Sequence, residues 1–175
     1  DKFTIFTQLI AEAERQVAVG IEKEHTGAMR LRVAEKDATS IMEIATFLPI
    51  RVINTHSHHI FESGPIYRRK FLDWGLFYHS EAFLPCWRQY ERALKQRNAA
   101  LRDKRPKREI DVWTDELVKH GLEFHRLREE YVQQLTPYII SAASELLPFQ
   151  DYCIEYLPGW DASVDFAQSL ASDFA

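Results

Sequence analysis

The 175-residue chain is long enough for one domain, or for one domain and a small part of another, and its 46% hydrophobic and 13% aromatic residues suffice for a packed core. Its net charge is -4, no stretch reaches the roughly 18 consecutive apolar residues of a membrane span, and no secretory leader pattern opens the chain. These features exclude a membrane-spanning or exported protein and predict a soluble, cytoplasmic one.

The first third of the chain has the pattern of β-strands. QVAVGI at 16–21 and MRLRV at 29–33 alternate apolar residues with others, and FTIFTQL at 3–9 predicts a third strand. The sequence EHTG lies between the first two and suits a hairpin loop, in which Gly27 supplies a turn conformation that other residues resist. We expect an antiparallel sheet.

Two further elements are predicted before the pattern changes. TSIMEIATFL at 39–48 indicates a short helix, with Thr39 or Ser40 as its cap and Glu43 completing a capping box. LPIRVIN at 48–54 predicts another strand.

From Gly64 onward, apolar residues recur with the 3.6-residue period of helices. We predict one helix with Pro65 in its first turn, a second at about 81–102 and a longer third from Ile110. Pro137 is expected to kink or end the third helix. The short polar connector DKRPKRE predicts that the second and third helices form an antiparallel hairpin.

The last part of the chain is predicted to return to a strand, YCIEYL at 152–157, followed by a helix at 163–174. A helical block between β-containing parts is typical of an insertion. We therefore predict an α+β fold in three parts, which are a β-rich lobe at 1–62, an inserted helical arm at 63–148 and a returning strand and helix at 149–175. The chain starts at Asp1 without methionine and stops within a helical pattern, so we expect it to be part of a longer protein.

Charge is distributed unevenly along the chain. Residues 64–108 contain twelve Lys or Arg and four Asp or Glu, whereas residues 109–175 contain three and thirteen. Clustered cations bind phosphate backbones favourably. They also have other roles, because Lys and Arg solvate helix faces, stabilise helix C-termini or pair with acidic segments. For Arg69, an ion pair with Asp73 one turn away is a further explanation. The candidate DNA-binding residues are Arg68, Arg69, Lys70, Arg88, Arg92, Lys95, Arg97, Arg102, Lys104, Arg105, Lys107 and Arg108.

Other chemistry has weak support in the sequence. HSHH at 56–59 is more typical of exposed loop histidines than of a metal site, and His120 and His125 lie too far apart around a helix to form a one-face metal pair. No phosphate loop or nucleophile elbow is present. Cys86 and Cys153 lie among apolar residues and are expected to be reduced, buried thiols.

Two adjacent motifs resemble those of the RecF family of bacterial recombination mediators, which are ATPases of the SMC and ABC type. GPIYRRKFLDWG and RQYERALKQRNAALR carry the resemblance. One departure is that Thr55 and His56 stand where the family usually has proline followed by an acidic residue. The matching positions of the first motif are Gly64, Pro65, Arg68, Arg69, Phe71, Leu72 and Asp73.

The resemblance implies an ABC-type ATPase head whose antiparallel β-sheet lobe carries the inserted helical hairpin. It implies ATP and Mg²⁺ as cofactors, an ATP-dependent homodimer, DNA gaps and single-strand to double-strand junctions as targets, and RecO and RecR as partners in loading RecA during repair and the SOS response. The Walker A loop would precede Asp1, and the signature and Walker B motifs would follow Ala175. This chain alone is therefore expected to have no ATPase activity and to hold no nucleotide. The alternative is a helical arm that docks a repair partner without touching DNA.

Overall fold

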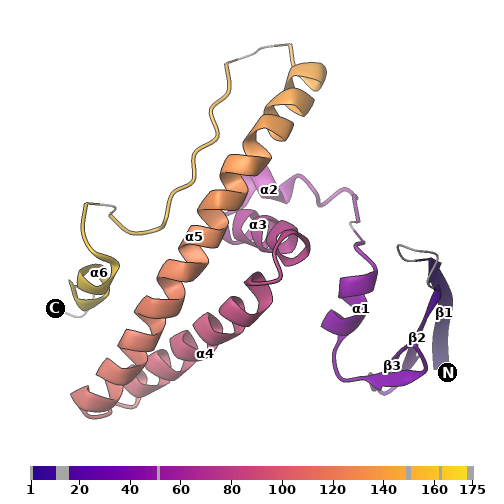
Figure 1. Cartoon of the computed structure of the whole chain (residues 1–175), viewed down its shortest axis with the longest axis horizontal. Helices are drawn as coiled ribbons and strands as arrows, with labels where there is room; N and C mark the ends of the chain where they lie inside the picture. Colours follow the sequence, from indigo (N-terminus) through magenta and orange to yellow (C-terminus); the bar gives the residue numbers. More distant parts are fainter. Residues whose placement is uncertain (1, 11–15, 51, 149–150, 162, 173–175) are drawn as a thin grey trace. The chain divides into compact units, whose positions relative to one another are not determined.

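The computed structural model divides the chain into two compact units, Asp1–Ser57 and His58–Ala175 (Figure 1). The residues that it describes are 2–10, 16–50, 52–148, 151–161 and 163–172.

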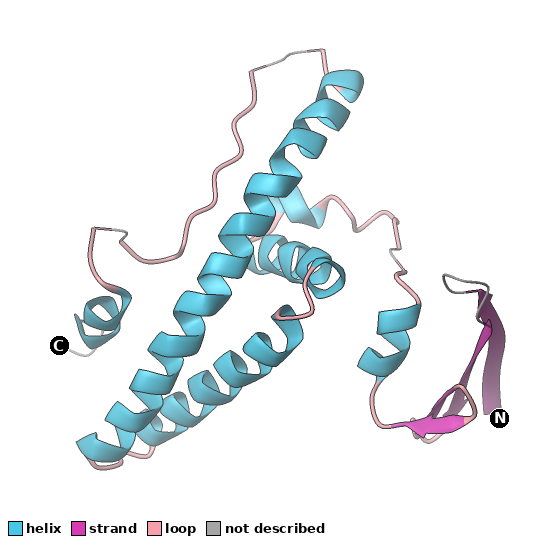
Figure 2. Cartoon of the chain, in the orientation of Figure 1, coloured by secondary structure: helices cyan, strands magenta, loops and turns pink. Residues whose placement is uncertain are grey.

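The first unit contains an antiparallel sheet in the order β1-β2-β3-β4. Its strands are magenta in Figure 2. Its strands are β1 (Lys2–Ile10), β2 (Gln16–Glu24), β3 (Met29–Val33) and β4 (Lys36–Ala38), and they are followed by helix α1 (Ile41–Phe47). The three predicted strands, the helix and the antiparallel pairing are confirmed. Successive side chains of a strand point to opposite faces of the sheet. Val17, Val19 and Leu31 lie on the buried face and pack with Ile44 of α1 in one core.

One local prediction in this unit is confirmed by backbone geometry, and the predicted capping box forms only in part. Gly27 has φ of +89° in the β2–β3 turn, which is the left-handed region that glycine enters without steric cost. Ser40 is the N-cap of α1 and makes no side-chain cap bond. Instead, the Glu43 carboxylate accepts hydrogen bonds from the backbone N–H of Thr39, at 3.1 Å, and from its hydroxyl group.

The strand predicted at 48–54 is wrong, because the described residues of this segment lie in a loop. Ile50, Val52 and Ile53 are 54%, 68% and 85% exposed. An apolar run becomes a strand only where another strand offers hydrogen-bond partners, and none of the described strands pairs with this segment.

The second unit is helical, with a long antiparallel hairpin formed by α4 and α5 (Figure 1). Its helices are α2 (His59–Glu62), α3 (Pro65–His79), α4 (Phe83–Arg102), α5 (Lys107–Leu146) and α6 (Phe166–Ser172). The predicted hairpin is confirmed, as is the start of α3, where Gly64 is the N-cap and Pro65 opens the helix. Helix α5 starts three residues before the predicted Ile110, directly after Pro106.

Helix α5 does not end at Pro137, so that part of the prediction is wrong. Proline removes one main-chain donor and crowds the preceding turn, where the Thr136 hydroxyl donates to the Val132 carbonyl at 2.7 Å. The helix continues to Leu146. A kink at Pro137 stays a prediction.

The strand predicted at 152–157 is also wrong, although the helix after it is confirmed as α6. The segment runs back along α5 as a loop (Figure 1) and pairs with no described strand. Cys153, on this segment, is exposed, so its predicted burial is wrong, whereas Cys86 is buried as predicted. Residues 149–150, 162 and 173–175 of the predicted returning part lie outside the described residues. The division of the chain into lobe, arm and return stays a prediction.

One core joins α3, α4 and α5 through Leu76, Phe83, Cys86, Phe124 and Leu127. Two glycines permit close approach to it. A Cβ on Gly75 would lie 2.0 Å from Tyr131 Oη, and one on Gly121 would lie 2.7 Å from Phe166 Cε1. Helix α3 can cross α5, and α6 can pack on α5, because glycine has no side chain at these two positions.

Gly75→Ala is expected to lower the free energy of unfolding by about 1–3 kcal/mol, because the methyl group overlaps the Tyr131 phenol. This sign is opposite to the ~1 kcal/mol by which alanine is otherwise preferred to glycine in a helix. Urea denaturation followed by circular dichroism measures the change. Gly20→Ala is the control, because its Cβ would make only an ordinary 3.7 Å contact with Arg32. A stabilised Gly75→Ala protein would contradict the packing described.

Candidate nucleic-acid interface

Four of the predicted cations form one exposed stripe along α4. At 100° per residue, Arg88, Arg92, Lys95 and Arg102 fall within about 80° of one another around the helix. All four side chains are exposed. We call these four residues the basic stripe.

Arg97 belongs to the opposite face of α4, and this corrects its selection as a surface residue. Its side chain is only 4% exposed. The guanidinium donates from Nε to Thr114 Oγ1 at 3.0 Å and from Nη2 to the Leu170 carbonyl at 3.2 Å. In this position Arg97 joins α4 to α5 and α6, and it is unsuited to contact DNA.

The basic stripe runs into the hairpin turn, where Lys104, Arg105, Lys107 and Arg108 are exposed. Within the described residues, three cations of the stripe and turn have carboxylate partners: Lys95 with Glu91 at 3.6 Å, Arg102 with Asp103 at 3.4 Å and Arg105 with Glu109 at 3.0 Å. Such exposed pairs are weak and exchange readily with solvent. The Arg92 guanidinium lies 5.9 Å from the centre of the Trp113 ring.

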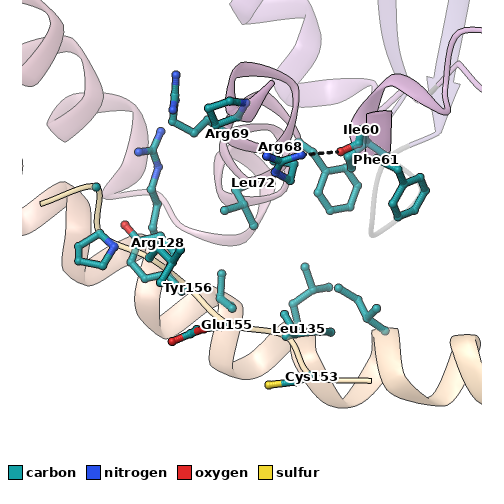
Figure 3. A pocket seen from close by; sticks show the side chains of 18 residues that line it. Ile60, Phe61, Arg68, Arg69, Leu72, Arg128, Leu135, Cys153, Glu155 and Tyr156 are labelled. Carbon is teal, nitrogen blue, oxygen red and sulfur yellow. Dashed lines mark hydrogen bonds between the residues drawn. The ribbon is translucent and has the colours of Figure 1, made fainter. Parts of the chain in front are cut away.

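Arg68, Arg69 and Lys70 form a separate group at the start of α3. Arg68 lines the same pocket as Val132, and Val132 is about 38 Å from Lys107 along α5 at 1.5 Å per residue. Arg68 Nη1 donates to the carbonyls of Ser63, at 3.1 Å, and Ile60, at 3.4 Å (Figure 3), which fixes α2 against α3. The twelve predicted cations therefore do not share one surface.

Asp73 forms its ion pair with Arg128 of α5, and Arg69, suggested as its partner on the sequence, adds a smaller electrostatic attraction. Arg128 donates from Nε to Oδ1 and from Nη2 to Oδ2, each at 2.8 Å, and its guanidinium lies 4.0 Å from the centre of the Phe124 ring. Burial raises the pKa of Asp73, and the positive charge of Arg128 opposes that rise. This two-bond pair fixes the first half of α3 on the middle of α5.

The chain is similar over almost its whole length to curated RecF proteins. It is 34% identical over 172 residues to the DNA replication and repair protein RecF of Haemophilus influenzae strain Rd, an alignment that covers 98% of this chain and 48% of that protein. It is 36% identical over 165 residues to RecF of Actinobacillus pleuropneumoniae serotype 5b, covering 94% and 46%. No protein-family model matches the chain.

The chain belongs to the RecF family. It spans about half the length of the curated RecF proteins it matches. A solved structure titled as the recombination mediator protein RecF with ATP in the RecFOR pathway matches its fold with a TM-score of 0.74 at 17% identity, covering 83% of this chain and 40% of that one. This likeness confirms the predicted α+β fold, with an antiparallel sheet and a helical hairpin.

The other candidate sites of this RecF-family chain have ordinary structural roles. His58 pairs with Glu62 at 3.2 Å, and His59 Nδ1 lies 3.0 Å from the Ser63 hydroxyl. No group of three or more His, Cys, Asp or Glu side chains that could hold a metal occurs among the described residues. Within that same part of the chain, no helix has both the length and the apolar character to span a bilayer.

Sequence reasoning missed Arg128. A signal for it was available, because Arg128 lies between Phe124 and Tyr131 on the apolar face of α5. A cation on such a face predicts a buried partner, since an unpaired charge there is costly.

Asp73→Ala is expected to lower the free energy of unfolding by about 2–4 kcal/mol, because it leaves the Arg128 guanidinium largely buried without its counter-charge. Urea denaturation monitored by tryptophan fluorescence measures the loss. The matched control is Arg126→Ala, which removes an exposed arginine from the same helix together with its contacts to Glu123 and Glu130. If the two substitutions had equal effects, the Asp73–Arg128 pair would not be the stabilising contact.

Proposed function

We propose that this RecF-family chain provides a DNA-binding surface, made of the basic stripe of α4 and the α4–α5 turn, to a recombinational repair protein. The observation that carries the proposal is the separation of charge on α4. Arg97 lies among the core residues, while the four stripe residues lie on the opposite, exposed face.

The composition of this surface favours a polyanion as its ligand. Residues 88–108 contain eight cations besides the buried Arg97, against two carboxylates, Glu91 and Asp103. The stripe extends about 21 Å from Arg88 to Arg102 along the helix. Four phosphate contacts by its cations would release condensed counterions and give a salt slope of about -3.6 on duplex DNA.

The whole-protein activity is part of the same proposal. In the full-length protein, ATP and Mg²⁺ would support a homodimer that binds single-strand gaps and junctions and acts with RecO and RecR to load RecA. The chain itself contains no Walker A sequence. We therefore expect neither ATP hydrolysis nor firm ATP binding by residues 1–175 alone.

The double substitution Arg88→Ala with Lys95→Ala is expected to weaken binding to gapped duplex DNA roughly tenfold at low salt and to make the salt slope shallower by about 2, because two phosphate contacts are lost. Fluorescence anisotropy between about 50 and 200 mM salt measures both quantities.

The matched control is Lys119→Ala with Arg126→Ala, which removes two exposed cations of α5 outside the basic stripe. Equal losses in the two double variants would indicate general charge attraction in place of a defined surface. Salt-insensitive binding to RecR, without DNA binding, would support the protein-docking alternative.

A further inference from the structure

The turn between α4 and α5 closes the hairpin (Figure 1) and has a well-bonded main chain. Helix α4 ends in a Schellman motif, in which the Arg105 N–H donates to the Ala100 carbonyl at 2.9 Å and the Lys104 N–H donates to the Leu101 carbonyl at 3.0 Å. Pro106 follows with its φ fixed at -53°. The turn therefore carries its side chains on an ordered backbone.

Lys104 occupies the position of this motif that favours glycine. Its φ is +52°, which is in the left-handed region. The Cβ of an L-residue is crowded there, so lysine makes the turn less stable than glycine would. This strain does not identify a function by itself, since Ala34 in the β3–β4 turn has a similar φ of +48°. Lys104 differs from Ala34 because it places a positive charge at the strained position.

The other charges of the turn also act against folding. Residues 102–108 contain five cations and one carboxylate, Asp103, so the cations repel one another. Lys107 and Arg108 lie in the first turn of α5, where the helix dipole favours a carboxylate over a cation. Arg102, in the last turn of α4, is favourably placed with respect to its own helix dipole. Stabilisation of a helix C-terminus therefore accounts for Arg102 but not for the cations that follow it.

A polyanion would offset each of these costs. Phosphates bound at the turn would remove the repulsion between its cations and would lie at the positive end of α5. The ordered main chain limits the loss of conformational freedom on binding. Residues that reduce stability are typical of surfaces whose function requires them.

We propose that Lys104 binds a phosphate of the DNA backbone, and that the turn gives up folding stability for affinity. This inference rests on the proposed function and adds to it a contact residue and the reason for its strained conformation. The ammonium group of Lys104 is a compact point charge, which suits a phosphate better than a base edge. Lys107 and Arg108 strengthen the positive field around the same phosphate groups.

Lys104→Gly is expected to change stability and affinity in opposite directions. The melting temperature rises by about 2 °C, because the strain at this position is removed. Binding to gapped duplex DNA weakens about threefold at about 50 mM salt, and the salt slope becomes shallower by about 0.9, because one phosphate contact is lost. Thermal unfolding followed by circular dichroism measures the first effect, and fluorescence anisotropy measures the second. A more stable protein that binds more weakly has not lost affinity through misfolding.

Three further variants separate charge from strain. Lys104→Arg keeps both and is expected to match the unmodified chain in melting temperature and, within twofold, in DNA affinity. Ala34→Gly relieves a similar strain in the other unit and is expected to leave DNA binding unchanged. Lys107→Ala with Arg108→Ala is expected to weaken DNA binding without lowering the melting temperature.

Three results would overturn the inference. They are unchanged DNA affinity of the Lys104→Gly protein, a lower melting temperature of that protein, and weakened binding to RecR with DNA binding unchanged, which would assign the turn to a protein partner. Failure of the proposed function would be seen differently, since the Arg88→Ala, Lys95→Ala protein would then also bind DNA normally.

Discussion

The two hydrogen bonds between Asp73 and Arg128 fix the position of α3 on α5, and the second unit is arranged around that crossing. Asp73 lies one turn after Arg69, so the same contact determines where the first turns of α3 present their cations. Close to this point, Gly75 lets α3 approach the ring of Tyr131. An ion pair alone tolerates small shifts, but a two-bond pair beside a close helix contact allows only one register.

Helix α4 shows that the position of a residue around a helix, and not its type, decides its role. Arg97 and the residues of the basic stripe are all cations. Arg97 donates hydrogen bonds to the Thr114 hydroxyl and the Leu170 carbonyl inside the unit, whereas the stripe faces solvent. The inner arginine stabilises the helical unit, and the outer ones are available to a ligand. A count of charges along the sequence does not distinguish the buried Arg97 from the exposed basic stripe.

Local patterns predicted most of the helices and the three longer strands, because periodicity, Gly64, Pro65 and the polar turn act over a few residues. Pairing between distant segments was harder to predict. The runs at 48–54 and 152–157 have strand-like sequences but no described partner strand, and Arg128 was not recognised as the partner of Asp73. Strand β4 was missed for a local reason, since its turn uses Ala34 and Glu35 at positive φ where glycine or asparagine is usual.

The bond from Arg97 to Leu170 connects the buried face of α4 to helix α6, which follows α5 in the chain. Both residues lie on the inner side of the unit, where Phe166 also rests against Gly121. A sideways movement of α4 under load would have to break this bond or carry α6 with it. Helices α4 and α6 are thus coupled, so that a displacement of one is expected to move the other.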